Sequence, residues 1–96
     1  MITPFDANGA LNVDEAVRLA RWLEANGNDG LVVSGTTGES STLTDNEKLT
    51  LWEAVIKAVS IPVIAGSGSN DTAHSVHLTK EVTKLGAAGI LAVGPY

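Results

Sequence analysis

The segment LVVSGTTGE, residues 31–39, decides the fold of this 96-residue chain. It begins with the continuously apolar run Leu31–Val33 and passes into a turn rich in glycine and threonine, Gly35–Gly38. Continuously apolar strands are typical of a parallel sheet that is buried on both faces. Parallel α/β proteins keep their active-site groups at the carboxyl ends of such strands, which is where this turn falls. The segment therefore predicts a parallel α/β fold and marks a candidate site.

The turn carries the hydrogen-bonding groups of a pocket for a small anion. Thr36 and Thr37 supply two hydroxyls and two backbone N–H groups, and the flanking Gly35 and Gly38 permit unusual φ/ψ angles. A small carboxylate or carbonyl group fits such a set of donors. An ordinary polar loop between a strand and a helix has the same local composition, so the turn alone leaves both interpretations open.

Two more apolar segments repeat the pattern at intervals of about thirty residues, the length of a strand, a helix and their loops. We expect strands at Leu31–Val33, Val63–Ala65 and Ile90–Val93 that are neighbours in this order. The glycine-bounded segments Gly27–Gly30 and Gly86–Gly89 each end a helix and lead into a strand.

Capping signals predict three helices. Asn12 caps the first, with Glu15 as its reciprocal partner, Thr44–Glu47 forms a full capping box for the second, and Asp71 or Thr72 begins the third. Apolar residues at helical spacing mark one buried face on each helix. These residues are Val13, Ala16, Val17, Ala20, Leu23, Leu51, Val55, Ala58, Val76, Leu78, Val82 and Leu85.

The composition is apolar for a chain of this length. Hydrophobic residues make up 44% of the sequence and charged residues only 18%, so we expect part of the apolar surface to be covered by something that residues 1–96 do not include. Met1–Pro4 looks like the end of a strand, and Val93–Tyr96 stops where a strand would pass into its loop. Residues 1–96 are therefore expected to be a single incomplete domain, either of an open sheet or of a (β/α)8 barrel.

Charge and composition exclude several classes of function. The formal net charge of −5 argues against nucleic-acid binding, because there is no basic patch to neutralise phosphates. No apolar run is long enough to cross a membrane, and no secretory signal is visible, so we expect a cytoplasmic protein. The absence of cysteine excludes disulfides, zinc–thiolate sites and thiol nucleophiles.

Three other features resemble functional motifs, but we expect each of them to have a structural role. Gly66–Asn70 follows a strand like a phosphate loop but lacks the Gly-Lys-Ser/Thr ending, so we expect it to face the same pocket as Thr36. His74 and His77 are one turn apart but lack a third ligand, so we expect a solvated face and no metal. Glu39 is expected to cap a helix or to form hydrogen bonds in the pocket wall.

Large and basic side chains on the helices are also expected to be structural. Trp22 and Trp52 should pack against neighbouring helices or another subunit. All lysines fall on predicted helices, so we expect solvated surface charges and no catalytic amine among them. They are Lys48, Lys57, Lys80 and Lys84.

Five motifs, in this order and spacing, resemble the dihydrodipicolinate synthase and N-acetylneuraminate lyase family over the whole chain. They are Thr3–Phe5, Gly35–Glu39, Leu43–Glu47, Pro62–Gly66 and Gly94–Tyr96. The resemblance implies the amino-terminal part of a (β/α)8 TIM barrel, about the first three to four βα units, with helices on the outer face. It also favours a functional site at the Gly35–Gly38 turn over an ordinary loop.

The resemblance implies a class I aldolase-type lyase, in which a lysine forms a Schiff base with pyruvate and no other cofactor is needed. In synthase members the enamine attacks L-aspartate 4-semialdehyde, on the route to lysine and diaminopimelate. That lysine lies on a later strand of the family fold, outside these residues, so the 96 residues alone are expected to be inactive. The parent protein is expected to be a homo-oligomer, a dimer or a tetramer.

Individual roles follow from the same resemblance. Thr37 matches the residue that holds the pyruvate carboxylate, with Gly35 and Gly38 beside it, and Thr36 matches a member of a proton relay. Tyr96 matches the first of two paired tyrosines next to that relay. A threonine at position 36 favours the synthase over N-acetylneuraminate or 2-keto-3-deoxy sugar acid aldolases. A non-catalytic α/β module that binds a carboxylate is the remaining alternative.

Overall fold

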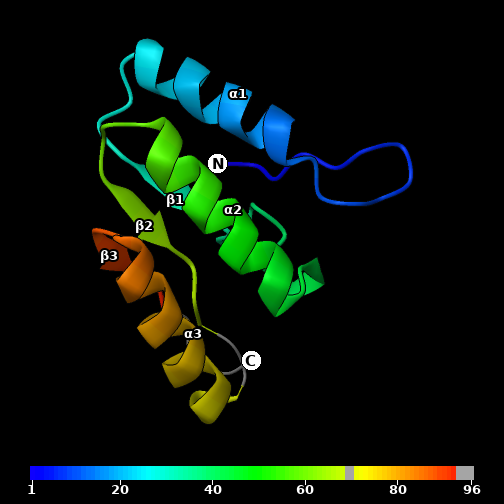
Figure 1. Cartoon of the computed structure of the whole chain (residues 1–96), viewed down its shortest axis with the longest axis vertical. Coiled ribbons are helices and arrows are strands. Elements are labelled where there is room, and N and C mark those ends of the chain that lie inside the picture. Colours follow the sequence, from blue (N-terminus) through cyan, green and yellow to red (C-terminus); the bar gives the residue numbers. More distant parts are fainter. Residues whose placement is uncertain (69–70, 93–96) are drawn as a thin grey trace.

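Helices and strands alternate along the chain in the computed structural model, which describes residues 1–68 and 71–92. In the described residues the elements are α1 (Val13–Ala25), β1 (Leu31–Val33), the 3₁₀ turn η1 (Ser40–Thr42), α2 (Asp45–Ala58), β2 (Val63–Ala65), α3 (Thr72–Leu85) and β3 (Gly89–Ile90). The three α-helices lie in one layer on the same side of the sheet (Figure 1). This one-sided arrangement is that of the outer face of a barrel, as predicted.

The sheet is parallel, with the strand order β1-β2-β3. Leu31 pairs with Val63, Val33 pairs with Ala65, and Ala65 in turn pairs with Ile90. The order, the direction and the bounds of β1 and β2 confirm the prediction. The third strand is shorter than predicted, because β3 ends at Ile90, and Val93 lies outside the described residues.

The segment Met1–Pro4 is not a strand, although it lies beside β1. The Met1 amino group donates a hydrogen bond to the Val32 carbonyl oxygen at 2.8 Å. A strand needs a ladder of such bonds, but Pro4 has no N–H to contribute, and Phe5 turns away to pair with Leu11 in an isolated antiparallel bridge.

The two faces of the sheet are buried to different extents. In β1 and β2 the first and third residues are buried, while the middle residues, Val32 and Ile64, are only half-buried. The prediction of burial on both faces is therefore wrong for the described residues. Successive side chains on a strand point to opposite faces, and the helices cover only one of them.

Side-chain caps fix the starts of α1 and α2. The Asn12 side chain accepts a hydrogen bond from the Glu15 N–H at 3.1 Å, but the Glu15 carboxylate pairs with Arg18 and does not return to Asn12. The reciprocal bond predicted for α1 is therefore wrong. At α2 both bonds of the capping box are present, from Glu47 N–H to Thr44 Oγ1 at 3.2 Å and from Thr44 N–H to Glu47 Oε1 at 2.9 Å.

The core lies between the helix layer and the sheet. Asp71 caps α3 as predicted, by accepting hydrogen bonds from two N–H groups of its first turn. Val76 is 49% exposed and is not part of the core, contrary to prediction. It lies two residues before the buried Leu78, which is about 200° around the helix. The buried apolar residues are Ala16, Ala20, Leu31, Val33, Leu43, Leu51, Trp52, Val55, Val63, Ala65, Leu78 and Val82.

The expectations for large and basic side chains have different outcomes. Trp52 is fully buried as expected, while Trp22 is 56% exposed on this chain, so its predicted packing against another subunit stays a prediction. Lys48 is only 5% exposed, although a solvated charge was predicted. It precedes Trp52 by one turn of α2 and so lies on the buried stripe, where the aliphatic stem of a lysine can pack against apolar neighbours. The remaining lysines, Lys57, Lys80 and Lys84, are exposed as predicted.

In residues 1–68 and 71–92, no helix combines the length and the apolar character needed to cross a membrane.

Candidate functional site

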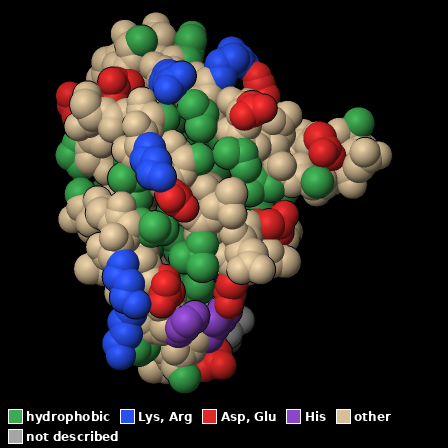
Figure 2. Space-filling view, viewed as in Figure 1, with side chains coloured by type: hydrophobic (Ala, Val, Ile, Leu, Met, Phe, Trp, Pro, Cys, Tyr) green, Lys and Arg blue, Asp and Glu red, His purple; other side chains and the backbone are tan. Residues whose placement is uncertain are grey.

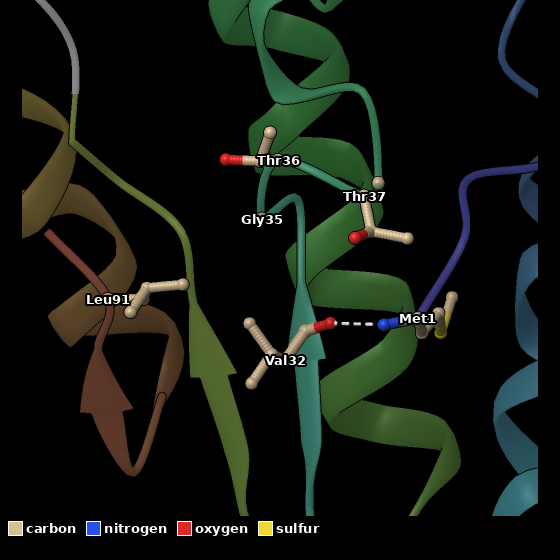
Figure 3. A pocket seen from close by; sticks show the side chains of 7 residues that line it. Met1, Val32, Gly35, Thr36, Thr37 and Leu91 are labelled. Carbon is tan, nitrogen blue, oxygen red and sulfur yellow. Dashed lines mark hydrogen bonds between the residues drawn. The ribbon is translucent and has the colours of Figure 1, made fainter. Parts of the chain in front are cut away.

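The turn Gly35–Gly38 lines a cavity of about 290 Å³ at the carboxyl end of β1. Val32 forms its floor from the half-buried face of the sheet, and Met1 and Leu91 flank it on either side (Figure 3). Four of the five predicted site residues are therefore brought together. The fifth, Tyr96, lies outside the described residues.

The donors of Thr36 and Thr37 are free to bind a ligand. Both residues are exposed, and among the described residues neither their N–H groups nor their hydroxyls have a hydrogen-bond partner. The Thr36 carbonyl oxygen accepts a hydrogen bond from the Glu39 N–H at 3.0 Å, which closes the turn. A closed turn with unpaired N–H and O–H groups can donate hydrogen bonds to the oxygens of a carboxylate.

Ser34 anchors the turn at its start. It is 1% exposed, and its hydroxyl accepts a hydrogen bond from the Trp52 indole Nε1 at 2.8 Å and donates one to the Gly66 carbonyl oxygen at 3.2 Å. No motif in the sequence marks this serine. The available signal was a polar residue directly after a continuously apolar strand, where a buried hydroxyl requires partners.

Thr3 anchors the turn at its end. It is 5% exposed, and its hydroxyl donates a hydrogen bond of 2.6 Å to the Gly38 carbonyl oxygen. A Cβ atom at Gly38 would lie 2.9 Å from the Met1 carbonyl oxygen, so glycine is needed here for space. Thr3 was noted in the sequence only as part of a motif.

The left-handed angles at this turn lie beside Gly35 and Gly38 and not at them. Among the non-glycine residues that the structure describes, Ser34, with φ 56°, and Glu39, with φ 57°, adopt left-handed angles, and they flank the two glycines on the outside. Glu39 stands at the N-cap of η1, but its side chain makes no capping bond, so its predicted capping role is wrong.

The α-amino group of Met1 belongs to a residue that lines the cavity with the turn. Burial lowers its pKa, because desolvation disfavours the charged form. Its hydrogen bond to the Val32 carbonyl oxygen holds it at the rim of the cavity (Figure 3).

The described part of the second loop, Gly66–Gly68, supports the site but does not line it. The Gly66 N–H donates to the Val33 carbonyl oxygen at 2.9 Å, and the Ser67 hydroxyl lies 2.8 Å from the Thr79 hydroxyl of α3. The loop therefore joins β1, β2 and α3 beneath the turn. Its last two residues lie outside the described ranges.

The predicted histidine pair divides between two environments. His74 Nε2 lies 2.7 Å from both carboxylate oxygens of Asp45, while His77 is exposed. Histidine and acidic side chains adjoin at the beginning of α3 (Figure 2). Within the described ranges, no group of three or more His, Cys, Asp or Glu side chains could hold a metal ion.

Known proteins match the chain in sequence and in structure. The 4-hydroxy-tetrahydrodipicolinate synthase 2 of Halalkalibacterium halodurans is 55% identical over 98 residues, covering 100% of this chain and 34% of the relative. A dihydrodipicolinate synthase structure from Bacillus anthracis superposes with a TM-score of 0.95 at 46% identity, covering 100% of this chain and 34% of that one. A pyruvate-complexed dihydrodipicolinate synthase from Acinetobacter baumannii gives 0.96 at 36% identity, with coverages of 100% and 34%.

The chain thus spans about a third of the length of the relatives it matches. The family model described as the dihydrodipicolinate synthetase family matches residues 1–96, the whole sheet and the turn included. With its parallel sheet, one-sided helices and threonine turn, the chain belongs to the dihydrodipicolinate synthetase family.

Proposed function

We propose that these residues form the amino-terminal part of a 4-hydroxy-tetrahydrodipicolinate synthase, which condenses pyruvate with L-aspartate 4-semialdehyde in lysine and diaminopimelate biosynthesis. Family membership supports a lyase of this type, and relatives that carry this enzyme name match the entire chain. The observation that carries the proposal is the pair of threonines with free donors at the carboxyl end of β1. We further propose a cytoplasmic homo-oligomer.

In this proposal the turn binds and orients pyruvate. The Thr37 N–H and hydroxyl donate to the carboxylate, while the Thr36 hydroxyl, both donor and acceptor, passes a proton between the substrate and tyrosines of the relay. Pyruvate would be held as a Schiff base on a lysine of the remaining two thirds of the enzyme, without a further cofactor. Tyr96 is proposed to stand next to the relay.

Replacing each threonine with valine separates binding from proton transfer. The test protein is a chimera in which this chain replaces the matching segment of the H. halodurans relative. Thr37→Val should weaken pyruvate binding by about 1–3 kcal/mol, because valine keeps the volume but loses the hydroxyl. Thr36→Val should lower kcat more than it raises the KM for pyruvate. Steady-state kinetics check both results, and wild-type kinetics in both variants would contradict the assigned roles.

The 96-residue chain alone should form no Schiff base on its lysines. Lys48 and Lys57 lie on α2 and Lys80 and Lys84 on α3, and none of them lines the cavity with Thr36. Incubation with pyruvate, borohydride reduction and peptide mass spectrometry should therefore find no stoichiometric lysine adduct. Labelling of a single lysine in full yield would contradict the proposal that the reactive amine comes from elsewhere in the enzyme.

The choice of second substrate distinguishes this proposal from its main rival, another pyruvate-dependent lyase of the family. The chimera assayed with aspartate semialdehyde, N-acetylneuraminate and a 2-keto-3-deoxy sugar acid should show its highest kcat/KM with aspartate semialdehyde. Because the rest of the chimera comes from the relative, the same substrates must be tested on the unmodified relative. A shift of preference to a sugar acid in the chimera alone would favour the rival.

A further inference from the structure

The Ser34 hydroxyl joins three elements beneath the cavity. It accepts a hydrogen bond from Trp52 of α2, follows directly on β1, and donates to the Gly66 carbonyl oxygen at the end of β2. Trp52 is fully buried. A buried indole N–H requires an acceptor, and in the described residues the Ser34 hydroxyl is the one it has.

The backbone of Ser34 is strained. Its φ of 56° lies in the left-handed region, which a residue with a Cβ adopts only when its surroundings hold it there. Because Ser34 immediately precedes Gly35, its φ and ψ angles set the direction in which the chain enters the turn. The two hydrogen bonds of its hydroxyl tie the Ser34 side chain to β2 and α2.

We infer that Ser34 and Trp52 are positioning residues that fix the conformation of the Gly35–Gly38 turn, with Trp52 acting through the Ser34 hydroxyl. Neither side chain lines the cavity, so their effect on a ligand is indirect. They present the Thr36 and Thr37 donors in one arrangement before a carboxylate arrives, and a ligand then does not have to order the turn.

The effect on the turn's conformation stands without any ligand, whereas its consequence for pyruvate binding rests on the proposed function. The test therefore measures the turn first, in the 96-residue chain. Amide correlation spectra and hydrogen exchange are recorded for wild type, Ser34→Ala, Trp52→Phe and the double variant. Trp22→Phe is the matched control, since Trp22 is an exposed tryptophan on α1.

Ser34→Ala should shift the indole N–H resonance of Trp52 and speed exchange of the Gly35–Gly38 amides by about tenfold, as expected for loss of local protection. Trp52→Phe should change the same amides in the same direction. The double variant should match Ser34→Ala alone, because a residue that acts through Ser34 has no further effect once the hydroxyl is gone. Trp22→Phe should leave the turn unchanged.

Ser34→Gly covers the case in which alanine prevents folding, because glycine removes the hydroxyl and also relieves the left-handed strain. It too should speed exchange of the Gly35–Gly38 amides. Wild-type exchange in the turn of Ser34→Gly and Trp52→Phe would overturn the inference, as would an added effect of Trp52→Phe in the Ser34→Ala background. Pyruvate binding is read separately, in the chimera: a wild-type chimera that folds but does not bind pyruvate would count against the proposed function and leave the exchange result intact.

Discussion

Replacing Gly66 with alanine is expected to lower the free energy of unfolding by about 3 kcal/mol, at the upper end of the range for overpacking. A Cβ atom at this position would lie 2.2 Å from the Ser34 carbonyl oxygen and 2.8 Å from its carbonyl carbon. Both are backbone atoms of the residue that anchors the turn, so a flexible side chain cannot move aside. To accommodate the methyl group, the ends of β1 and β2 must separate.

Gly89→Ala is the matched control for this substitution. Gly89 also belongs to the sheet, but the nearest atom to an added Cβ is the Ile64 Cγ1 at 3.6 Å, an ordinary contact. Its free energy of unfolding should stay within about 1 kcal/mol of the wild type. Urea unfolding followed by far-ultraviolet circular dichroism measures both variants. If the two variants lost equal amounts of the free energy of unfolding, the close approach of Gly66 to Ser34 would not be the reason that alanine is unfavourable at position 66.

Replacing Trp52 with alanine is expected to cost about 3–5 kcal/mol of the free energy of unfolding, the usual range for emptying a buried aromatic site. Trp52 is fully buried and is the largest side chain in the core. The substitution also removes the donor that partners the Ser34 hydroxyl. In a chain of this length a loss of that size is a large fraction of the total stability.

Trp22→Ala provides the comparison, because Trp22 is 56% exposed and should contribute about 0.5 kcal/mol or less. Circular dichroism is again the appropriate probe, since each variant removes one of the two tryptophans that fluorescence would report. A Trp22 variant as unstable as the Trp52 variant would contradict the core described above.

The features that the sequence predicted well are those with a local physical cause. The bounds of β1 and β2 follow from short apolar runs between turn residues, and the capping box at Thr44–Glu47 follows from its residue types and spacing. The position of the cavity follows from the rule that parallel strands present their loops at one edge.

The features that the sequence did not predict depend on contacts between distant residues. Ser34 and Trp52 are 18 positions apart, and Thr3 and Gly38 are 35 apart, so no local pattern marks either pair. Glycine is the residue that most readily adopts left-handed angles, yet at this turn Ser34 and Glu39 adopt them, where tertiary contacts and the turn overrule the usual preference.

The burial of Lys48 was also not predicted from its residue type. Its charge predicted an exposed side chain, yet its place on α2 puts it on the helix face toward the core. Val76 is the opposite case, an apolar residue on the exposed side of α3. Residue type sets a preference for a buried or an exposed position, and the angular position on the helix decides whether the side chain is buried.

The most direct test of the proposed function is the condensation of pyruvate with aspartate semialdehyde by the chimera, in which this chain replaces the matching segment of the H. halodurans 4-hydroxy-tetrahydrodipicolinate synthase 2. We expect turnover by the chimera, and a raised KM for pyruvate when Thr37→Val is introduced into it. A chimera that folds with the circular dichroism spectrum of the relative but neither binds pyruvate nor turns over, while the relative does both, would contradict the account.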